Sequence, residues 1–191
     1  MKVGLFFGSF NPIHVGHMVI ANHMLAHSDL DRIWFVVSPH NPLKEKNSLL
    51  HERQRLQMVM LAIGDNNKMK ASNIEFKLPQ PSYTINTLAY LKEKHPNYDF
   101  ALIMGSDNLE GFHKWKNHEE ILKNYELYVY PRPNNKETEL FKHKSVKMIN
   151  APLMEISSTA IRNAVKEKKD VRYFVPADVW EYMREMHFYE K

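Results

Sequence analysis

The residues most able to do chemistry are two histidines near the amino terminus, His14 and His17. They close the segment GSFNPIHVGH, residues 8–17, which joins a short apolar run to an expected helix. Small residues let the backbone approach a ligand, and a helix start offers unpaired N–H groups and the positive end of a dipole. Imidazoles three positions apart lie on one side of a helical turn. The segment therefore predicts a binding site for phosphate oxygens.

Other interpretations of this segment are weaker. It lacks the Gly-Lys-Ser/Thr ending of a Walker loop and the G-x-G-x-x-G pattern of dinucleotide folds. A zinc site at His14 and His17 has no evident third ligand, and the chain contains no cysteine. A lone histidine is often a satisfied structural residue, but two in a setting of glycine and proline favour phosphate binding.

A second candidate group of polar residues ends at Arg162. A guanidinium can hold two oxygens of an anion through parallel hydrogen bonds. Ser157 and Ser158 precede it at an expected helix start, where hydroxyl groups either cap the helix or donate to a ligand. The two roles are compatible, so both stay open.

Four segments, in order along the chain, resemble motifs of the nicotinate and nicotinamide mononucleotide adenylyltransferase family. This family belongs to the nucleotidyltransferase superfamily, which includes class I aminoacyl-tRNA synthetases. The histidine pair resembles the (H/T)-x-G-H motif, and ISSTAIR at residues 156–162 resembles the I-S-S-T-x-I-R motif. PSYTINTL at residues 81–88 is similar to nicotinate-nucleotide members, as is GSDNL at 105–109 with Trp115-Lys116 and Arg132-Pro133.

The resemblance implies transfer of AMP from ATP to the phosphate of nicotinate mononucleotide, with release of pyrophosphate. The attacking phosphate oxygen is already ionised at neutral pH, so the reaction needs positioning and charge stabilisation rather than a protein base. Mg²⁺ would come with ATP and be held mostly by the triphosphate and water, with no protein metal ligand.

The resemblance also assigns roles to individual residues. The catalytic residues it implies are His14, His17 and Arg162. The ATP-binding residues it implies are Gly8, Ser9, Phe10, His14, His17, Gly105, Asp107, Ile156, Ser157, Ser158 and Arg162. The mononucleotide-binding residues it implies are Ser9, Lys44, Tyr83, Thr84, Trp115 and Arg132. For the contact with the mononucleotide phosphate, Lys46 is the alternative to Lys44.

Several positions depart from the family pattern. Phe7 stands where bacterial members usually have the first of two glycines, and Asn11 replaces the usual aspartate. The loop before Lys44 lacks the histidine that bacterial members commonly carry. These departures leave the choice between nicotinate and nicotinamide mononucleotide open. Phosphopantetheine adenylylation on the same fold, or an RNA-binding module suggested by the basic charge, are the rival hypotheses.

Short apolar strands and amphipathic helices alternate along the chain. We expect strands at residues 3–7, 33–37, 69–76, 100–104, 127–130 and 146–149. We expect helices at residues 15–27 and 52–63, the second ended by Gly64. A further helix is expected to be capped by Ser82 or Thr84, and others are expected near 119–122, from Ser158 and from Pro176. This pattern predicts an α/β fold with a Rossmann-like doubly wound parallel sheet and helices on both faces. Ligands of such sheets bind beyond the carboxyl ends of the strands, where the strand order reverses.

Length and composition bound the remaining possibilities. The chain has 191 residues, 43% of them hydrophobic, which predicts a single nucleotidyltransferase domain over residues 1–191. A small helical part from about residue 156 to 191 is expected to complete the active site.

Without cysteine there is no disulfide, thiolate metal site or cysteine nucleophile. The net charge of +4 suits anionic small molecules, and we expect no nucleic-acid or membrane partner and a cytoplasmic location. Association into a homo-oligomer stays open.

Overall fold

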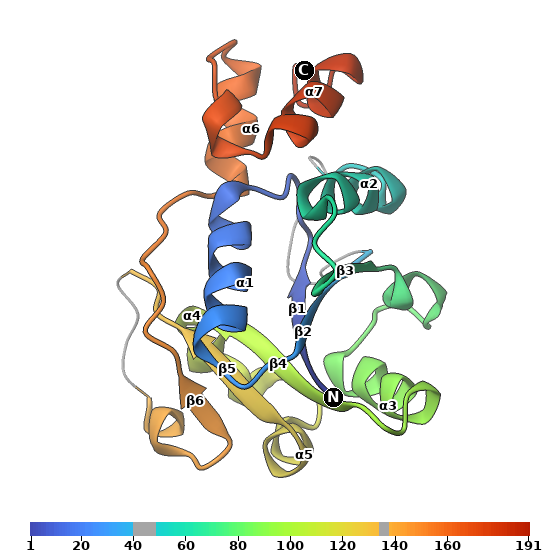
Figure 1. Cartoon of the computed structure of the whole chain (residues 1–191), viewed down its shortest axis with the longest axis vertical. Helices are drawn as coiled ribbons and strands as arrows, with labels where there is room; N and C mark the ends of the chain where they lie inside the picture. Colours follow the sequence, from blue (N-terminus) through green and yellow to red (C-terminus); the bar gives the residue numbers. More distant parts are fainter. Residues whose placement is uncertain (40–48, 134–137) are drawn as a thin grey trace.

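A parallel sheet forms the centre of the computed structural model, which describes residues 1–39, 49–133 and 138–191. Its six strands lie in the order β3-β2-β1-β4-β5-β6 (Figure 1). They are β1 (Lys2–Gly8), β2 (Arg32–Val37), β3 (Met69–Ser72), β4 (Asp99–Gly105), β5 (Glu126–Tyr130) and β6 (Val146–Met148). Each neighbouring pair is parallel. The predicted α/β fold class is confirmed.

The helices follow the strands in alternation. They are α1 (Val15–His27), α2 (Glu52–Ile63), α3 (Thr84–Lys94), α4 (Ser106–Glu110), α5 (His118–Asn124), α6 (Ser158–Lys166) and α7 (Ala177–Glu185). Single 3₁₀ turns are η1 (Ile74–Lys77), η2 (Phe112–Lys114), η3 (Glu139–Lys142) and η4 (Arg172–Phe174). Within the described ranges, no helix has the length and apolar character needed to cross a bilayer. Figure 1 shows α6 and α7 standing together at one end of the molecule.

Both faces of the sheet are covered by helices. Phe6 and Ile103 point to one face, where they share a buried cluster with α1, α2, α6 and α7. Leu5 and Leu102 point to the other face and pack with α3, α4 and α5. Because side chains of a strand alternate between two buried faces, these strands have the nearly continuous apolar sequence of doubly covered parallel sheets.

The strand order reverses between β1 and β4. Strands β2 and β3 extend from β1 to one side of the sheet, and β4, β5 and β6 extend to the other. Phe6 pairs with Ile103, so that Gly8 and Gly105 end their strands at the same level. The loops that follow these two glycines therefore diverge from neighbouring strands and leave a crevice between them, as in other doubly wound sheets.

Two local predictions are wrong. The strand expected over residues 69–76 ends at Ser72, and Ile74–Lys77 form η1 instead. Ser72 pairs with Val36, one residue before the end of β2, so a longer β3 would have almost no neighbour to pair with. Neither Ser82 nor Thr84 caps α3, because Tyr83 occupies the N-cap position and Thr84 is the first helical residue.

A fully buried arginine holds the loops at the crevice. Arg55 of α2 is 0% exposed. Among the described residues, its guanidinium donates four hydrogen bonds, each to a backbone carbonyl. Its Nη1 donates to the Ser9 carbonyl at 2.5 Å and to the Ser38 carbonyl at 2.8 Å. Its Nε and Nη2 donate at 2.8 Å to the carbonyls of Leu50 and Pro39. One side chain thus joins the loop after β1, the loop after β2 and the start of α2.

We expect Arg55→Met to lower the free energy of unfolding by about 3 kcal/mol or more, because four hydrogen bonds to half-buried carbonyls are lost at about 1 kcal/mol each. Urea denaturation measures the change. The control is Arg53→Met, at an exposed position on the same helix, which should alter stability by less than about 0.5 kcal/mol. Equal stability of the two variants would contradict the role given to Arg55.

Candidate active site

A cavity of about 910 Å³ lies where β1 and β4 end. It is lined by the loop after β1, the start of α3, the loop after β4 and the segment that leads into α6. The predicted site residues that it brings together are Gly8, Ser9, Phe10, His14, His17, Tyr83, Thr84, Gly105, Asp107, Trp115, Arg132, Ile156, Ser157, Ser158 and Arg162. Lys44 lies outside the described residues.

The two histidine rings stack on each other at the start of α1. Their centroids are 3.7 Å apart and their planes differ by 29°. Gly16 makes room for this stack, since a Cβ at that position would lie 3.0 Å from Nδ1 of His14. The backbone N–H of His14 donates to Nδ1 of His17 at 3.2 Å. The neutral His17 ring therefore carries its proton on Nε2 and can donate from there.

His14 is a neutral residue at pH 7. It is 6% exposed, and this burial, followed by the positive charge of Arg132, lowers its pKa from 6.5 to about 4. Its Nδ1 atom is buried and has no hydrogen-bond partner among the residues that the structure describes. A neutral imidazole offers one donor and one acceptor, so His14 brings hydrogen-bonding capacity to the cavity without a charge.

Phe10 supports the histidines from the protein core. Its backbone φ is 47°, in the left-handed region that non-glycine residues rarely adopt. The ring is buried, with centroid distances of 5.1 Å to His17 and 5.6 Å to Phe35. A nucleotide could therefore meet Phe10 only at its backbone.

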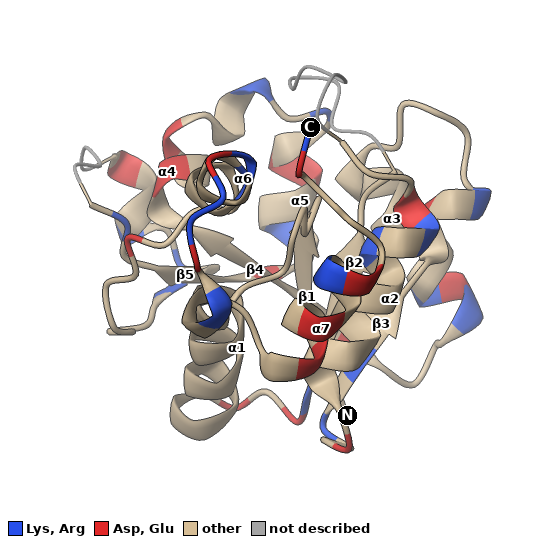
Figure 2. Cartoon of the chain, turned by 90° about the horizontal axis from the view of Figure 1, so that it is seen from above, with Lys and Arg blue, Asp and Glu red and all other residues tan. Residues whose placement is uncertain are grey.

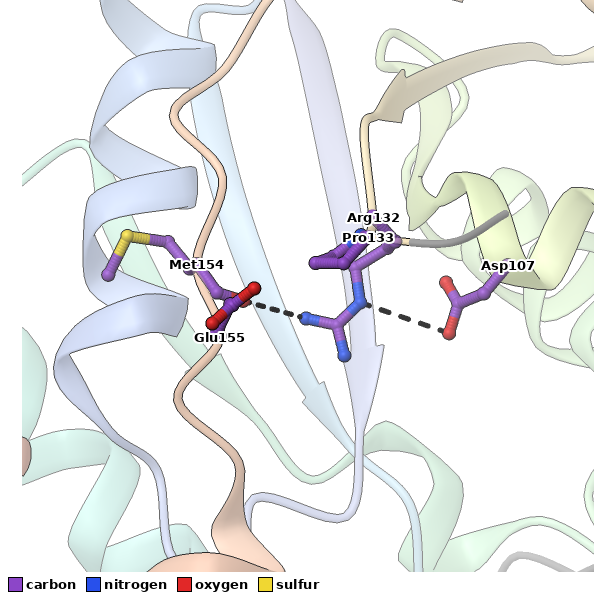
Figure 3. Close-up of a pocket in the computed structure, with 5 residues that line it drawn as sticks. All are labelled: Asp107, Arg132, Pro133, Met154 and Glu155. Carbon is purple, nitrogen blue, oxygen red and sulfur yellow. Dashed lines mark hydrogen bonds and ion pairs between the residues drawn. The ribbon is translucent and has the colours of Figure 1, made fainter. Parts of the chain in front are cut away.

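Arg132 lies on the β4 side of the cavity, between Asp107 and the segment before α6 (Figure 3). Its Nε is 4.0 Å from a carboxylate oxygen of Asp107, and its Nη1 donates to the Met154 carbonyl at 3.3 Å. A side chain at Gly105 would obstruct this arrangement, because its Cβ would lie 2.8 Å from Cγ of Arg132 and collide with Asp107. Arg132, predicted to bind the mononucleotide, is thus next to Asp107, predicted to bind ATP.

The start of α6 is tied to the loop between β1 and α1. Ser157 caps the helix, since its Oγ accepts the Ala160 N–H at 3.2 Å. The Ser158 hydroxyl donates to the Pro12 carbonyl at 2.9 Å. Nη1 of Arg162 donates to the Asn11 carbonyl at 2.8 Å. These bonds bring two predicted phosphate-binding segments, distant in sequence, to one end of the cavity.

Another part of the lining is aromatic and basic. Tyr83 is 38% exposed, and the ammonium of Lys116 lies 4.6 Å from the centre of its ring. Trp115 packs on Phe112 with a centroid distance of 5.1 Å. This wall offers stacking surfaces for a flat ring together with a positive charge.

Sequence reasoning missed Glu75 as a lining residue. It is 3% exposed, and its carboxylate accepts the Thr87 hydroxyl at 2.8 Å. Burial raises its pKa, opposed by hydrogen bonds from Thr87, Ser38 and Ser82. The available signal was an acidic residue between Ile74 and Phe76, inside a stretch that we expected to form a strand.

Comparisons with known proteins converge on one group. Residues 5–164 match the family model described as cytidylyltransferase-like. A probable nicotinate-nucleotide adenylyltransferase of Flavobacterium johnsoniae is 58% identical over 100% of both chains. One from Bacteroides thetaiotaomicron is 46% identical, covering 97% of this chain and 92% of the relative. In fold, the chain is similar to Plasmodium falciparum nicotinic acid mononucleotide adenylyltransferase complexed with NaAD. That similarity has a TM-score of 0.83 and 21% identity, over 99% of this chain and 97% of the other.

We expect a nuclear magnetic resonance titration to give His14 a pKa of about 4, because burial opposes protonation of the ring. In the unfolded chain the ring titrates near 6.5. Between these values the unfolded state binds a proton that the folded state does not, so stability falls as the pH is lowered from about 6.5 to 4. The loss should be roughly 3 kcal/mol. His14→Gln should lack this component of the pH dependence, and a folded-state pKa of 6.5 or higher would contradict the burial of the ring.

Proposed function

Because this chain belongs to the cytidylyltransferase-like family and, within it, to the nicotinate-nucleotide adenylyltransferases, we propose that it transfers the adenylyl group of ATP to nicotinate mononucleotide. The products are nicotinate adenine dinucleotide and pyrophosphate. The observation that carries this proposal is that His17, Arg162 and Trp115 line the same cavity. It combines donors for phosphate oxygens with a stacking surface for a ring.

The reaction is an in-line displacement between phosphates. An oxygen of the mononucleotide phosphate forms a bond to the α-phosphorus of ATP, and the bond from that phosphorus to the pyrophosphate oxygen breaks. No proton has to be removed, since the attacking oxygen is ionised at neutral pH. The ring N–H groups of His14 and His17 donate hydrogen bonds to the ATP phosphates, where charge changes during transfer. Arg162 holds the pyrophosphate through the N–H donors that its bonds to Asn11 and Thr159 leave available.

The positions of the lining residues support the remaining ATP contacts in this proposal. The hydroxyl groups of Ser157 and Ser158 add donors beside Arg162, in addition to their bonds within the protein. Asp107 is placed after β4 to accept from a ribose hydroxyl. Residues that shape the ATP site mainly through backbone atoms are Gly8, Ser9, Phe10, Gly105 and Ile156.

The mononucleotide lies against the aromatic wall in this proposal. Trp115 stacks on the pyridine ring, while Tyr83, Thr84 and backbone N–H groups meet the pyridine substituent. Lys116 over the Tyr83 ring favours the negatively charged carboxylate of nicotinate over the neutral amide of nicotinamide. Ser9, Arg132 and Lys44 complete the proposed mononucleotide set.

Mg²⁺ is proposed to enter with ATP. Two carboxylates line the cavity among the described residues, those of Glu75 and Asp107. Glu75 is buried and bound to hydroxyl groups, and Asp107 lies beside Arg132. This donor set fits an ion whose ligands are mostly phosphate oxygens and water, the usual arrangement for Mg²⁺ with nucleotides. Such an ion would neutralise charge on the triphosphate.

The wider assignments are also proposals. Residues 1–191 would act as one domain, with the part from about 156 completing the site, which is supported by Ser157 and Arg162 in the cavity lining. ATP and nicotinate mononucleotide would be the partners, in the cytoplasm, with neither nucleic acid nor membrane involved. Basic and acidic residues are interspersed over the view in Figure 2, rather than gathered as in a nucleic-acid footprint.

We expect purified protein with ATP and Mg²⁺ to form a dinucleotide from nicotinate mononucleotide. Nicotinamide mononucleotide should react more slowly, and phosphopantetheine should not react. Chromatographic detection of each product measures this. The absence of turnover with both pyridine nucleotides would overturn the proposed function.

We expect His17→Ala to lower kcat by about 100-fold or more, because a donor aimed at the transferring phosphate is lost. Steady-state kinetics measures the change. The control is His23→Ala, which removes another partly buried histidine of α1 outside the cavity lining and should leave kcat close to the parent value. A His17→Ala enzyme with normal kcat would remove His17 from the reaction.

A further inference from the structure

The carboxyl-terminal segment, residues 177–191, contains α7 and reaches the loop between β1 and α1. Tyr189 is partly buried, and its ring packs at 6.2 Å from the Phe188 ring. Its hydroxyl donates to Oδ1 of Asn11 at 2.8 Å, across 178 positions of sequence. Burial raises the pKa of Tyr189, against the positive charges of Arg162 and Arg55. The hydroxyl therefore keeps its proton and remains a donor at any physiological pH.

Asn11 is the point where three parts of the chain meet. It is 5% exposed. Besides the Tyr189 hydroxyl, its Oδ1 accepts the backbone N–H of Leu50 at 3.2 Å, and its carbonyl accepts Nη1 of Arg162 at 2.8 Å. A backbone N–H can only donate, so the atom facing Leu50 must be the amide oxygen. The Asn11 side chain is therefore held in one orientation from two directions.

The same residue connects this orientation to the cavity. Asn11 lines the cavity together with Arg162 and His14, and the carbonyl that receives the Arg162 guanidinium is its own. The two bonds to Oδ1 tie the main chain of Asn11 to neighbouring segments, so a main-chain shift after loss of the Tyr189 bond would move the carbonyl that holds the Arg162 guanidinium. A displacement of about 1 Å at a reacting group can lower a rate by about 100-fold.

We propose that Tyr189 is a positioning residue, which orients Asn11 and through it sets the Arg162 guanidinium for the pyrophosphate group. The inference rests on the proposed function for its kinetic readout. It extends the site beyond the four family-like segments to a residue of the carboxyl-terminal segment. It also gives the side chain of Asn11 a use that an aspartate could share, because both residues present an acceptor oxygen to Tyr189 and Leu50.

The test is Tyr189→Phe, which removes one hydroxyl and keeps the ring. We expect kcat to fall about tenfold and the affinity for pyrophosphate, measured by calorimetry, to fall by a similar factor. The KM for nicotinate mononucleotide should stay within about twofold of the parent value. The matched control is Tyr182→Phe, another partly buried tyrosine of this segment, whose ring lies 5.4 Å from Phe188. It should leave all three values unchanged.

A double-mutant cycle with Arg162→Lys separates positioning from general loss of structure. If Tyr189 acts through Arg162, Tyr189→Phe should change kcat by less than about twofold in the Arg162→Lys background. Unchanged kcat and pyrophosphate affinity in the single variant, or a full tenfold loss in both backgrounds, would overturn the inference.

If the parent protein showed no adenylyl transfer, the proposed function would fail. The pyrophosphate affinities of the parent and Tyr189→Phe would still decide this inference.

Discussion

The parallel pairing of β1 with β4 is the constraint on which the rest of the structure depends. These two strands are adjacent in the sheet but separated by about half of the chain, and Phe6 lies level with Ile103. Their loops therefore leave the same edge of the sheet in opposite directions and open the cavity between them. The loop after β1 brings the stacked histidines, and the loop after β4 brings Asp107. Any loss of this register would separate the two halves of the site.

The cations at this edge are held mostly by neutral acceptors. Arg55 donates to carbonyls of three segments, and Arg162 donates to the Asn11 carbonyl and the Thr159 hydroxyl. A carbonyl fixes a guanidinium without cancelling its charge, so the positive potential remains available to phosphates. His14, neutral because it is buried, adds hydrogen-bonding capacity to this edge without a charge. The resulting site suits two polyanionic substrates that must be brought close together.

The sequence allowed prediction where the determining forces are local. The helix over residues 52–63 was predicted with its observed bounds, since its apolar spacing and the terminal Gly64 are both adjacent features. The strand from residue 69 was predicted too long, because its end depends on where β2 stops. The candidate site residues within the described ranges line one cavity, and their roles stay predictions, whereas Glu75 and the bond between Tyr189 and Asn11 were not predicted. Both depend on tertiary contacts, the second across 178 positions, for which the local sequence carries no periodic or motif signal.

A crystal structure of the protein with a non-hydrolysable ATP analogue tests the central claim most directly. The account predicts that the triphosphate lies in the cavity between β1 and β4, with a phosphate oxygen within about 3.2 Å of Nε2 of His17. It also predicts the terminal phosphates against the Arg162 guanidinium. A triphosphate bound at this edge without contact to either side chain, or bound elsewhere on the protein, would contradict the account.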